Sequence, residues 1–271
     1  MSNIIVRTIT GAIYTGLIII SLTLHPFFLG IITVILNYFA LREFQTLAEK
    51  SKSIASNTRW IYINISLCIL TISIISFDFQ PIYIFIPMLV LPLSYMMVAL
   101  FDKNNGSLNN LSFAIFGTIY ITVPLMILNL LQQISIHQHI SFALAVFVII
   151  WTNDTFAYLS GMAFGKHRMF ERISPKKSWE GFAGGLFMAI IASMVFYYFF
   201  PAPGLVNWIL FGILTVIVSN LGDFFESFLK RKAGTKDSGT LLPGHGGMLD
   251  RIDSMLFVCP VIFIYLLLIL K

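Results

Sequence analysis

Charged residues are scarce in this chain of 271 residues, where Asp, Glu, Lys and Arg together make up only 11%. Soluble domains typically carry about 25% charged residues, so the composition excludes an ordinary soluble protein. Hydrophobic residues reach 58%, and the mean hydropathy is +0.88. Helices satisfy their own backbone hydrogen bonds within lipid. We therefore expect an all-α, polytopic integral membrane protein with a single membrane domain over residues 1–271.

The sequence also lacks the patterns of several common functional sites. The two cysteines, Cys68 and Cys259, lie in apolar runs without histidines at metal spacing, so they are expected to be buried hydrophobic side chains and not zinc ligands. The phosphate-binding pattern G-x4-G-K-[ST] is absent, and no Ser-His-Asp arrangement stands out. The first apolar run continues into a second without a small-residue cleavage site, so no cleavable signal peptide is expected.

Long hydrophobic runs are what the chain does have. About 20 apolar residues cross a bilayer as a helix. By this measure we expect about nine transmembrane helices, near residues 8–24, 26–42, 60–77, 81–101, 110–132, 139–160, 181–200, 204–221 and 252–270.

Positive charge orients these spans, because Lys and Arg concentrate in cytoplasmic loops. With the N-terminus inside, the cytoplasmic segments are the start of the chain and residues 42–59, 102–109, 161–180 and 222–251. They hold 1, 4, 1, 5 and 5 basic residues, which is 16 of the 17 in the chain. The sequence therefore predicts a cytoplasmic N-terminus, a non-cytoplasmic C-terminus after Lys271, and both polar loops of the second half in the cytoplasm.

The most polar stretch runs from Ser227 to Asp253 and mixes cations, carboxylates and glycines. Polar groups near lipid are costly and mark functional sites. A basic run beside a membrane also serves as a topology signal or a contact for anionic lipid. Here the interleaved acids and the glycines favour a metal-bound polyphosphate, because glycine lets backbone amides approach phosphate closely. For His245, a phosphate or nucleotide contact and a plain turn position both stay open.

This stretch resembles the signature of the phosphatidate cytidylyltransferases, also called CDP-diacylglycerol synthases. Every fixed position of that signature is filled, by Ser227, Leu229, Lys230, Arg231, Lys236, Asp237, Gly239, Leu242, Pro243, His245, Gly246, Gly247, Met248, Asp250, Arg251, Ile252 and Asp253. The run Ile173–Gly181 and Asp154 with Ala157 and Tyr158 are also similar to that family. The resemblance divides the chain into an N-terminal membrane-spanning half, 1–140, and a catalytic half, 141–271, that carries the signature 227–253.

Carboxylates are the proposed metal ligands. Asn220, Asp223 and Ser227 form one polar stripe at helical spacing, and Asp250 and Asp253 open the last span, where Asp253 could instead cap the helix. Magnesium takes one or two carboxylates with phosphate oxygens and water. We expect Mg²⁺, with a second cation left open, on ligands drawn from Asp223, Asp250 and the intramembrane Asp154.

The resemblance also implies roles for individual residues. Those expected in catalysis are Asp223, Lys236, Asp237, Asp250 and Arg251. Those expected to bind substrate are Lys176, Lys177, Ser178, Ser227, Lys230, Arg231, His245, Gly246 and Gly247.

A second phosphate site is expected near Ser174. Ser174 followed by Pro175 is typical of a helix N-cap and its first residue, which would place Lys176 and Lys177 in the first turn. The helix dipole disfavours cations there unless an anion is bound. The competing interpretation is that Lys176 and Lys177 only mark this loop as cytoplasmic.

The resemblance implies an enzyme that transfers CMP from CTP to phosphatidic acid, giving CDP-diacylglycerol and pyrophosphate for phospholipid biosynthesis. We expect it in the plasma or inner membrane, with its active site on the cytoplasmic face and no nucleic-acid partner; a homodimer is left open. A CTP-dependent polyprenol or phytol kinase is the nearest alternative enzyme. A transporter with Asp154 as its coupling acid is the alternative from another class, although most of the acids lie at one face and not at mid-membrane.

Overall fold

The computed structural model describes residues 3–23, 26–51, 59–76, 90, 93–97, 100, 107–138, 142–241 and 246–270. The chain divides into two compact units, each made of two segments. The first comprises Met1–Gln133 and Lys232–Arg251, and the second comprises Ile134–Arg231 and Ile252–Lys271. The halves expected from the sequence, 1–140 and 141–271, stay a prediction. The units differ from them in that residues 232–251 fold with the N-terminal segment.

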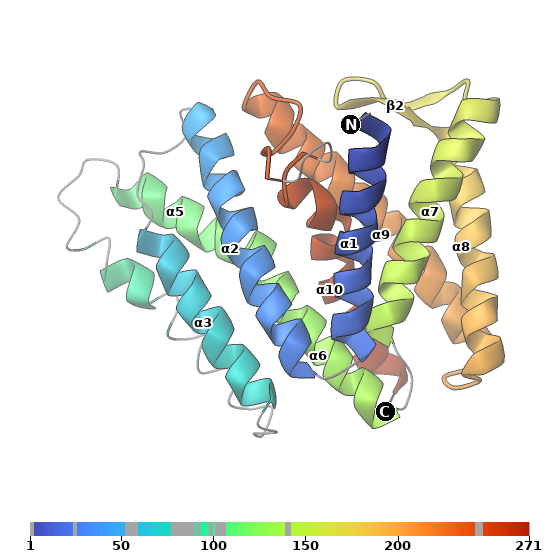
Figure 1. The fold of residues 1–271 in the computed structure, drawn as a ribbon, viewed down its shortest axis with the longest axis horizontal. Coiled ribbons are helices and arrows are strands. Elements are labelled where there is room, and N and C mark those ends of the chain that lie inside the picture. Colours follow the sequence, from blue (N-terminus) through green and yellow to red (C-terminus); the bar gives the residue numbers. More distant parts are fainter. Residues whose placement is uncertain are drawn as a thin grey trace. The chain divides into compact units, whose positions relative to one another are not determined.

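The first unit is built from helices α1 (Asn3–Thr23), α2 (Pro26–Lys50), α3 (Arg59–Ser76) and α5 (Ser107–Gly117), and from the first part of α6 (Val123–Gln138). Figure 1 shows these helices in blue to green. Its apolar core includes Leu29, Leu41, Ile61, Ile121 and Leu125, each at most 1% exposed. A π-helix, Thr118–Thr122, joins α5 to α6 just before Pro124. Because Pro124 has no N–H to continue the α-helical ladder, a widened turn at this point is expected.

Neutral polar side chains lie inside this unit beside the π-helix. The hydroxyls of Thr118 and Thr122 each donate to the Asn64 side-chain oxygen at 2.9 Å. Thr122 also lies 3.0 Å from the Asn37 side-chain oxygen, and Tyr95 bonds to both Asn64 and Thr118. Hydrogen bonds of this kind hold helices together where hydrophobic association gives little driving force.

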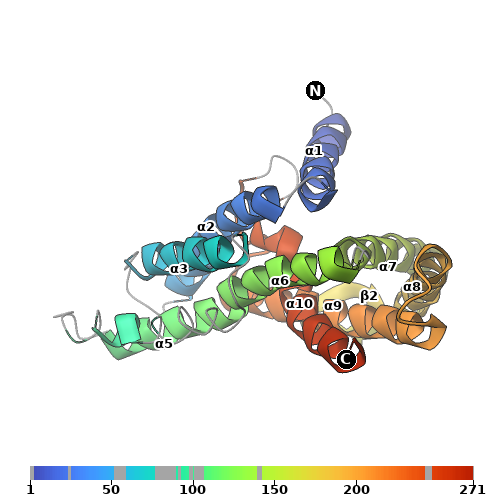
Figure 2. The same ribbon diagram turned by 90° about the horizontal axis from the view of Figure 1, so that it is seen from below.

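The second unit contains α7 (Phe142–Phe164), α8 (Trp179–Phe199), most of α9 (Leu205–Lys232) and most of α10 (Leu249–Ile269). Two short antiparallel strands, β1 (Arg168–Phe170) and β2 (Ser174–Ser178), connect α7 to α8. Figures 1 and 2 both show α7 and α8 side by side, and Figure 1 shows the hairpin at one end of the pair.

Small residues allow α7 and α8 to pack closely. A Cβ atom on Gly181 would lie 2.7 Å from the Ala157 carbonyl oxygen, and one on Gly185 would lie 2.5 Å from the Asn153 side-chain oxygen. On α7, Asn153, Ala157 and Gly161 follow at intervals of four residues and so share one helix face. Close approach through small residues is the usual way in which membrane helices associate. The contact fixes the start of α8 against α7.

The helices agree with the class expected from the sequence. Within the described residues, six helical segments are long and apolar enough to cross a membrane, with α5, the π-helix and α6 counting as one segment. The protein is therefore an all-α, multi-pass membrane protein apart from its short hairpin. Helices α1 and α3 also match predicted spans, whereas most of the predicted span 81–101 lies outside the described residues. Cys68 and Cys259 are buried and unpaired, as predicted.

Candidate active site

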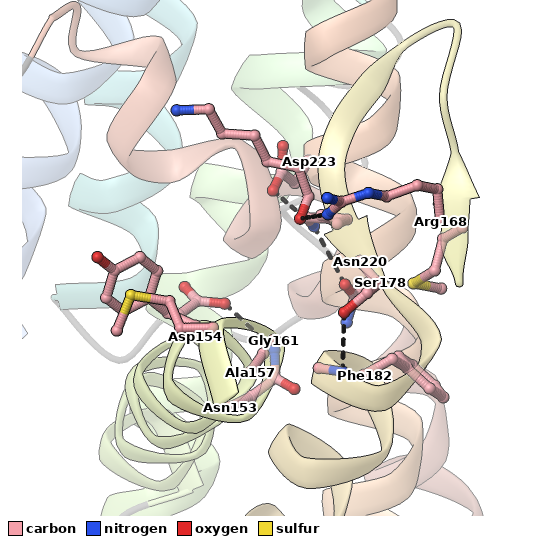
Figure 3. Close-up of a pocket in the computed structure, with 15 residues that line it drawn as sticks. Asn153, Asp154, Ala157, Gly161, Arg168, Ser178, Phe182, Asn220 and Asp223 are labelled. Atoms are coloured by element: carbon pink, nitrogen blue, oxygen red, sulfur yellow. Dashed lines mark hydrogen bonds and ion pairs between the residues drawn. The ribbon is translucent and has the colours of Figure 1, made fainter. Parts of the chain in front are cut away.

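A cavity of about 400 Å³ opens within the second unit. Figure 3 shows its walls: Asn153, Asp154, Ala157 and Gly161 come from α7, Arg168 from β1, and Asn220 and Asp223 from α9. Lys176 and Lys177 on β2 and Ser178, the residue before α8, add polar side chains to the lining, and Phe182 of α8 adds an apolar one. The cavity thus gathers cations and carboxylates that lie far apart in the sequence.

Lys177 is at the centre of this arrangement. Its ammonium group lies 2.6 Å from an Asp223 carboxylate oxygen and donates to the Asn220 side-chain oxygen at 3.1 Å. It also lies 4.7 Å from the centre of the Phe224 ring, within the range of a cation–π contact. The Lys177 and Asp223 side chains are 26% and 33% exposed, so a ligand in the cavity could still reach both.

Asp223 continues the polar stripe predicted on α9. The Ser227 hydroxyl donates to an Asp223 carboxylate oxygen at 3.2 Å, and Asn220 lies one turn before Asp223. The stripe is therefore confirmed as one face of the helix, with Lys177 bound to its first two members. Asp154 lines the same cavity and accepts a hydrogen bond from the Asn153 amide at 3.2 Å. Tyr158, four residues after Asp154 on α7, also lines it.

The predicted helix start at Ser174 is wrong. Residues Ser174–Ser178 form strand β2, and α8 begins at Trp179 with Ser178 as its N-cap. The Ser178 hydroxyl accepts the Gly181 N–H at 3.1 Å, which satisfies one of the free amides of the first turn. Extended backbone before proline suits a strand as well as a helix N-cap, and here the pairing of β2 with β1 selects the strand.

The two lysines expected in the first turn of the helix belong instead to strand β2. Lys176 and Lys177 lie before the helix and not in its first turn, so the dipole penalty inferred from the sequence does not apply to them. In a strand, neighbouring side chains point to opposite faces. Of these two lysines, Lys177 is the one that forms an ion pair in the described part of the chain, with Asp223. Lys176 is exposed at the cavity wall.

Glu180 anchors the hairpin to α8. Its carboxylate accepts from the backbone N–H groups of Lys166 and His167 at 3.1 and 3.2 Å, and the His167 ring lies 2.6 Å away. An acid in the first turn of a helix is also favoured by the dipole. Arg168 then donates to the Lys176 carbonyl oxygen at 3.2 Å and ties the two strands together. The sequence analysis assigned no role to Glu180 or Arg168, although Glu180 falls within the run Ile173–Gly181.

The first unit holds the second group of predicted residues, the turn before α10. One Asp250 carboxylate oxygen accepts from the backbone N–H groups of Ser238 and Gly247 at 3.0 and 2.8 Å, and the Ser238 hydroxyl lies 3.1 Å from it. Gly246 adopts a φ of +83°, a left-handed conformation that glycine tolerates and most residues do not. His245, for which a phosphate contact and a plain turn position both stay open, lies outside the described residues.

The other predicted cations and acids are dispersed. Lys230 forms an ion pair with Glu226, whose side chain is 1% exposed, one turn earlier on α9. That pair gives Lys230 a structural role that the sequence analysis did not anticipate, although the i, i+4 spacing signals it. Four further predicted residues are exposed: Arg231, Lys236, Asp237 and Arg251.

No complete protein metal site is present among the described side chains: no three of His, Cys, Asp and Glu gather around one point. Magnesium does not need such a cluster, because it usually binds one or two carboxylates with substrate phosphates and water. The cavity supplies oxygen donors of the required kind on Asp154 and Asp223. This donor set fits magnesium, and the ligand assignment stays a prediction.

Comparison with known proteins completes this description. The family model described as "Cytidylyltransferase family" matches residues 5–269. The chain belongs to the cytidylyltransferase family. The match covers almost all of this cytidylyltransferase-family protein, beyond the C-terminal half that carries the signature 227–253. A protein of Staphylococcus aureus (strain COL) named phosphatidate cytidylyltransferase is 40% identical over 185 residues, which cover 67% of this chain and 68% of the relative.

Two further relatives carry the same name. That of Staphylococcus saprophyticus is 39% identical over 178 residues, or 65% of each chain. That of Haemophilus influenzae is 44% identical over 122 residues, covering 43% of this chain and 42% of the relative. Similarity to this group therefore extends to relatives from quite different bacteria.

Proposed function

We propose that this protein transfers the cytidylyl group of CTP to phosphatidate, forming CDP-diacylglycerol and pyrophosphate. The observation that carries the proposal is the cavity of the second unit, where Lys177, Asp223 and Asn220 form a bonded polar group among membrane-spanning helices. Family membership and the shared name of its relatives give the reaction class. Both substrates are polyanions, and a lipid substrate accounts for an enzyme built within the membrane.

In the proposed reaction, a phosphate oxygen of phosphatidate attacks the α-phosphorus of CTP. A new P–O bond forms there, and the bond from the α-phosphorus to the oxygen bridging to the β-phosphate breaks, so that pyrophosphate leaves. The substrate provides the nucleophile, and the protein needs to align the two phosphates and balance their charge. Lys177 is placed to contact phosphate from the cavity wall, while Asp223 and Asn220 hold its ammonium group in position.

We further propose magnesium ligands in each unit, Asp154 and Asp223 in the cavity of the second unit and Asp250 in the turn of the first. The bound metal would offset the charge that develops on the leaving pyrophosphate. Ser227 would orient Asp223 through its 3.2 Å hydrogen bond. Ser238 and Gly247 would orient Asp250 through the hydrogen bonds that they donate to it.

The reaction can be tested with two labels. Purified protein in detergent, given phosphatidate, magnesium and CTP, is expected to move label from the α-phosphate of CTP into a chloroform-soluble product, and not from the γ-phosphate. Transfer of the γ-label would identify a lipid kinase instead. Absence of both labels from the lipid, with protein that binds CTP, would contradict the proposed function.

We also propose nine transmembrane helices with the N-terminus and the active site on the cytoplasmic side of the plasma or inner membrane. The support is the charge distribution, because 16 of 17 basic residues then face the cytoplasm. A reporter fused after Lys271 is expected to be non-cytoplasmic, since an odd number of spans separates the termini. A fusion within residues 161–172 serves as the opposite control. A cytoplasmic signal from the first fusion would contradict the span count or the orientation.

A further inference from the structure

Glu43 is an acid in helix α2 that forms hydrogen bonds with the turn before α10. Its carboxylate accepts from the backbone N–H groups of Met248 and Leu249 at 2.8 and 2.9 Å, and from the Ser238 hydroxyl at 2.7 Å. All of these residues belong to the first unit. Met248, Leu249 and Ser238 are each at most 8% exposed. Glu43 therefore holds two described stretches of the signature 227–253, here called the motif segment, one at Ser238 and one at Met248 and Leu249.

The chemistry of the contact requires a carboxylate. Three donors converge on two oxygens, and an ionised glutamate is an acceptor only. Glutamine would retain one acceptor oxygen and direct an NH₂ group at a second donor. Hydrogen bonds to a charged group are also stronger than neutral ones. A negative charge is favoured further by the free amides at the start of α10.

Two glycines of the motif segment are packed directly against Glu43. A Cβ atom on Gly239 would lie 2.5 Å from the Glu43 carboxylate, and one on Gly247 would come into still closer contact with it. The same Cβ on Gly247 would lie 2.6 Å from the Gly239 backbone nitrogen. The absence of side chains at these two positions is therefore what lets the carboxylate reach the buried amides.

Glu43 and Asp250 share a partner. The Ser238 hydroxyl lies 2.7 Å from Glu43 and 3.1 Å from Asp250, and it has one proton to donate. The shorter distance favours donation to Glu43, while Asp250 keeps the backbone amides of Ser238 and Gly247. Movement of Glu43 would thus displace Ser238 and Gly247, the two residues that orient Asp250.

We propose that Glu43 is a positioning residue for the transfer reaction, which fixes Ser238 and the start of α10 and thereby sets the position of Asp250. This inference rests on the proposed function for its kinetic consequence, although the contact itself does not. A glutamate that merely stabilised the fold would change the amount of active protein. A positioning glutamate also changes how the remaining active protein depends on magnesium, because Asp250 is a proposed metal ligand.

The test uses full-length protein in detergent and four variants. Glu43→Gln removes the charge, Ser238→Ala removes one donor, and the double variant combines them. Glu49→Gln is the matched control, because Glu49 lies on the same helix and bonds to Gln45 at 2.6 Å, away from the motif segment. Turnover, the KM for CTP and the magnesium requirement are measured, together with hydrogen exchange of peptides that cover Met248 and Leu249.

We expect Glu43→Gln to lower kcat about tenfold or more and to raise the magnesium requirement, as for loss of a group that orders the transition state. Met248 and Leu249 should exchange faster, while Glu49→Gln should match the wild type. Because Glu43 and Ser238 act through one contact, the double variant should lose less than the product of the two single effects.

Three results would overturn the inference. These are wild-type kinetics in Glu43→Gln, a loss of activity with unchanged magnesium dependence and amide exchange, and fully multiplicative effects in the double variant. The exchange measurement also separates the two proposals. If the wild type transfers no cytidylyl group, the proposed function fails, while faster exchange in Glu43→Gln would still support the positioning contact.

Discussion

Asp223→Asn is expected to reduce turnover by on the order of a hundredfold, about 2.7 kcal/mol of transition-state stabilisation. The substitution keeps the shape of the side chain and removes the charge that pairs with Lys177 at 2.6 Å. It also weakens the proposed metal site. Asp250→Asn should have an effect of similar size. Besides its proposed metal role, Asp250 accepts hydrogen bonds from the backbone N–H groups of Ser238 and Gly247. Turnover is measured over a range of magnesium concentrations.

Two variants control for loss of charge alone. Glu171→Gln removes an exposed acid from the loop between β1 and β2, and Glu49→Gln removes a half-buried acid from α2. Both should keep nearly normal turnover, and all four proteins should insert and purify alike. Near-normal activity of Asp223→Asn or Asp250→Asn at limiting magnesium would exclude that residue as an essential ligand.

Lys177→Gln is expected to lower activity strongly and to raise the apparent requirement for CTP or phosphatidate. The ammonium group lies between Asp223, Asn220 and the Phe224 ring, so it is held in place before any phosphate arrives. Its loss removes a fixed charge from the cavity wall, and the remaining amide cannot replace it. Lys176→Gln should have a smaller effect because that side chain is exposed. The double variant should therefore resemble Lys177→Gln.

Arg172→Gln is the matched control for this pair. It removes one exposed positive charge from the same loop without touching the cavity lining. Topology should survive in every variant, since Lys166 and Arg168 still mark the loop as cytoplasmic. Wild-type kinetics for both substrates in the double variant would show that the lysines only mark topology, and this part of the proposed site would be wrong.

Much of the helical framework could be predicted because hydropathy is a local property. The expected spans 181–200 and 204–221 correspond to helices Trp179–Phe199 and Leu205–Lys232, and the expected span 252–270 corresponds to Leu249–Ile269. The polar stripe from Asn220 to Ser227 also followed directly from helical spacing. Each of these inferences depends on residues within about one or two helical turns, or on the length of one apolar run.

The start of α8 was mispredicted because two local signals compete. Ser174 with Pro175 and Ser178 with Trp179 both begin a plausible helix, and serine is a good N-cap in either position. Pairing of β2 with β1 decides between them, because it takes up residues 174–178 before the helix begins. The bonds from Glu180 to the backbone of Lys166 and His167 hold that pairing in place.

By itself, the sequence determined that this is a helical membrane protein, which polar segments carry its chemistry, and which family signature they fill. Only the tertiary structure decided that Lys177 pairs with Asp223, and that Glu43 binds a turn about 200 residues further along the chain. The reason is physical. Burial and periodicity act along a single helix, whereas hydrogen bonds and ion pairs depend on which helices pack together. Here that packing depends on features such as the small-residue contact of Gly181 and Gly185 with α7.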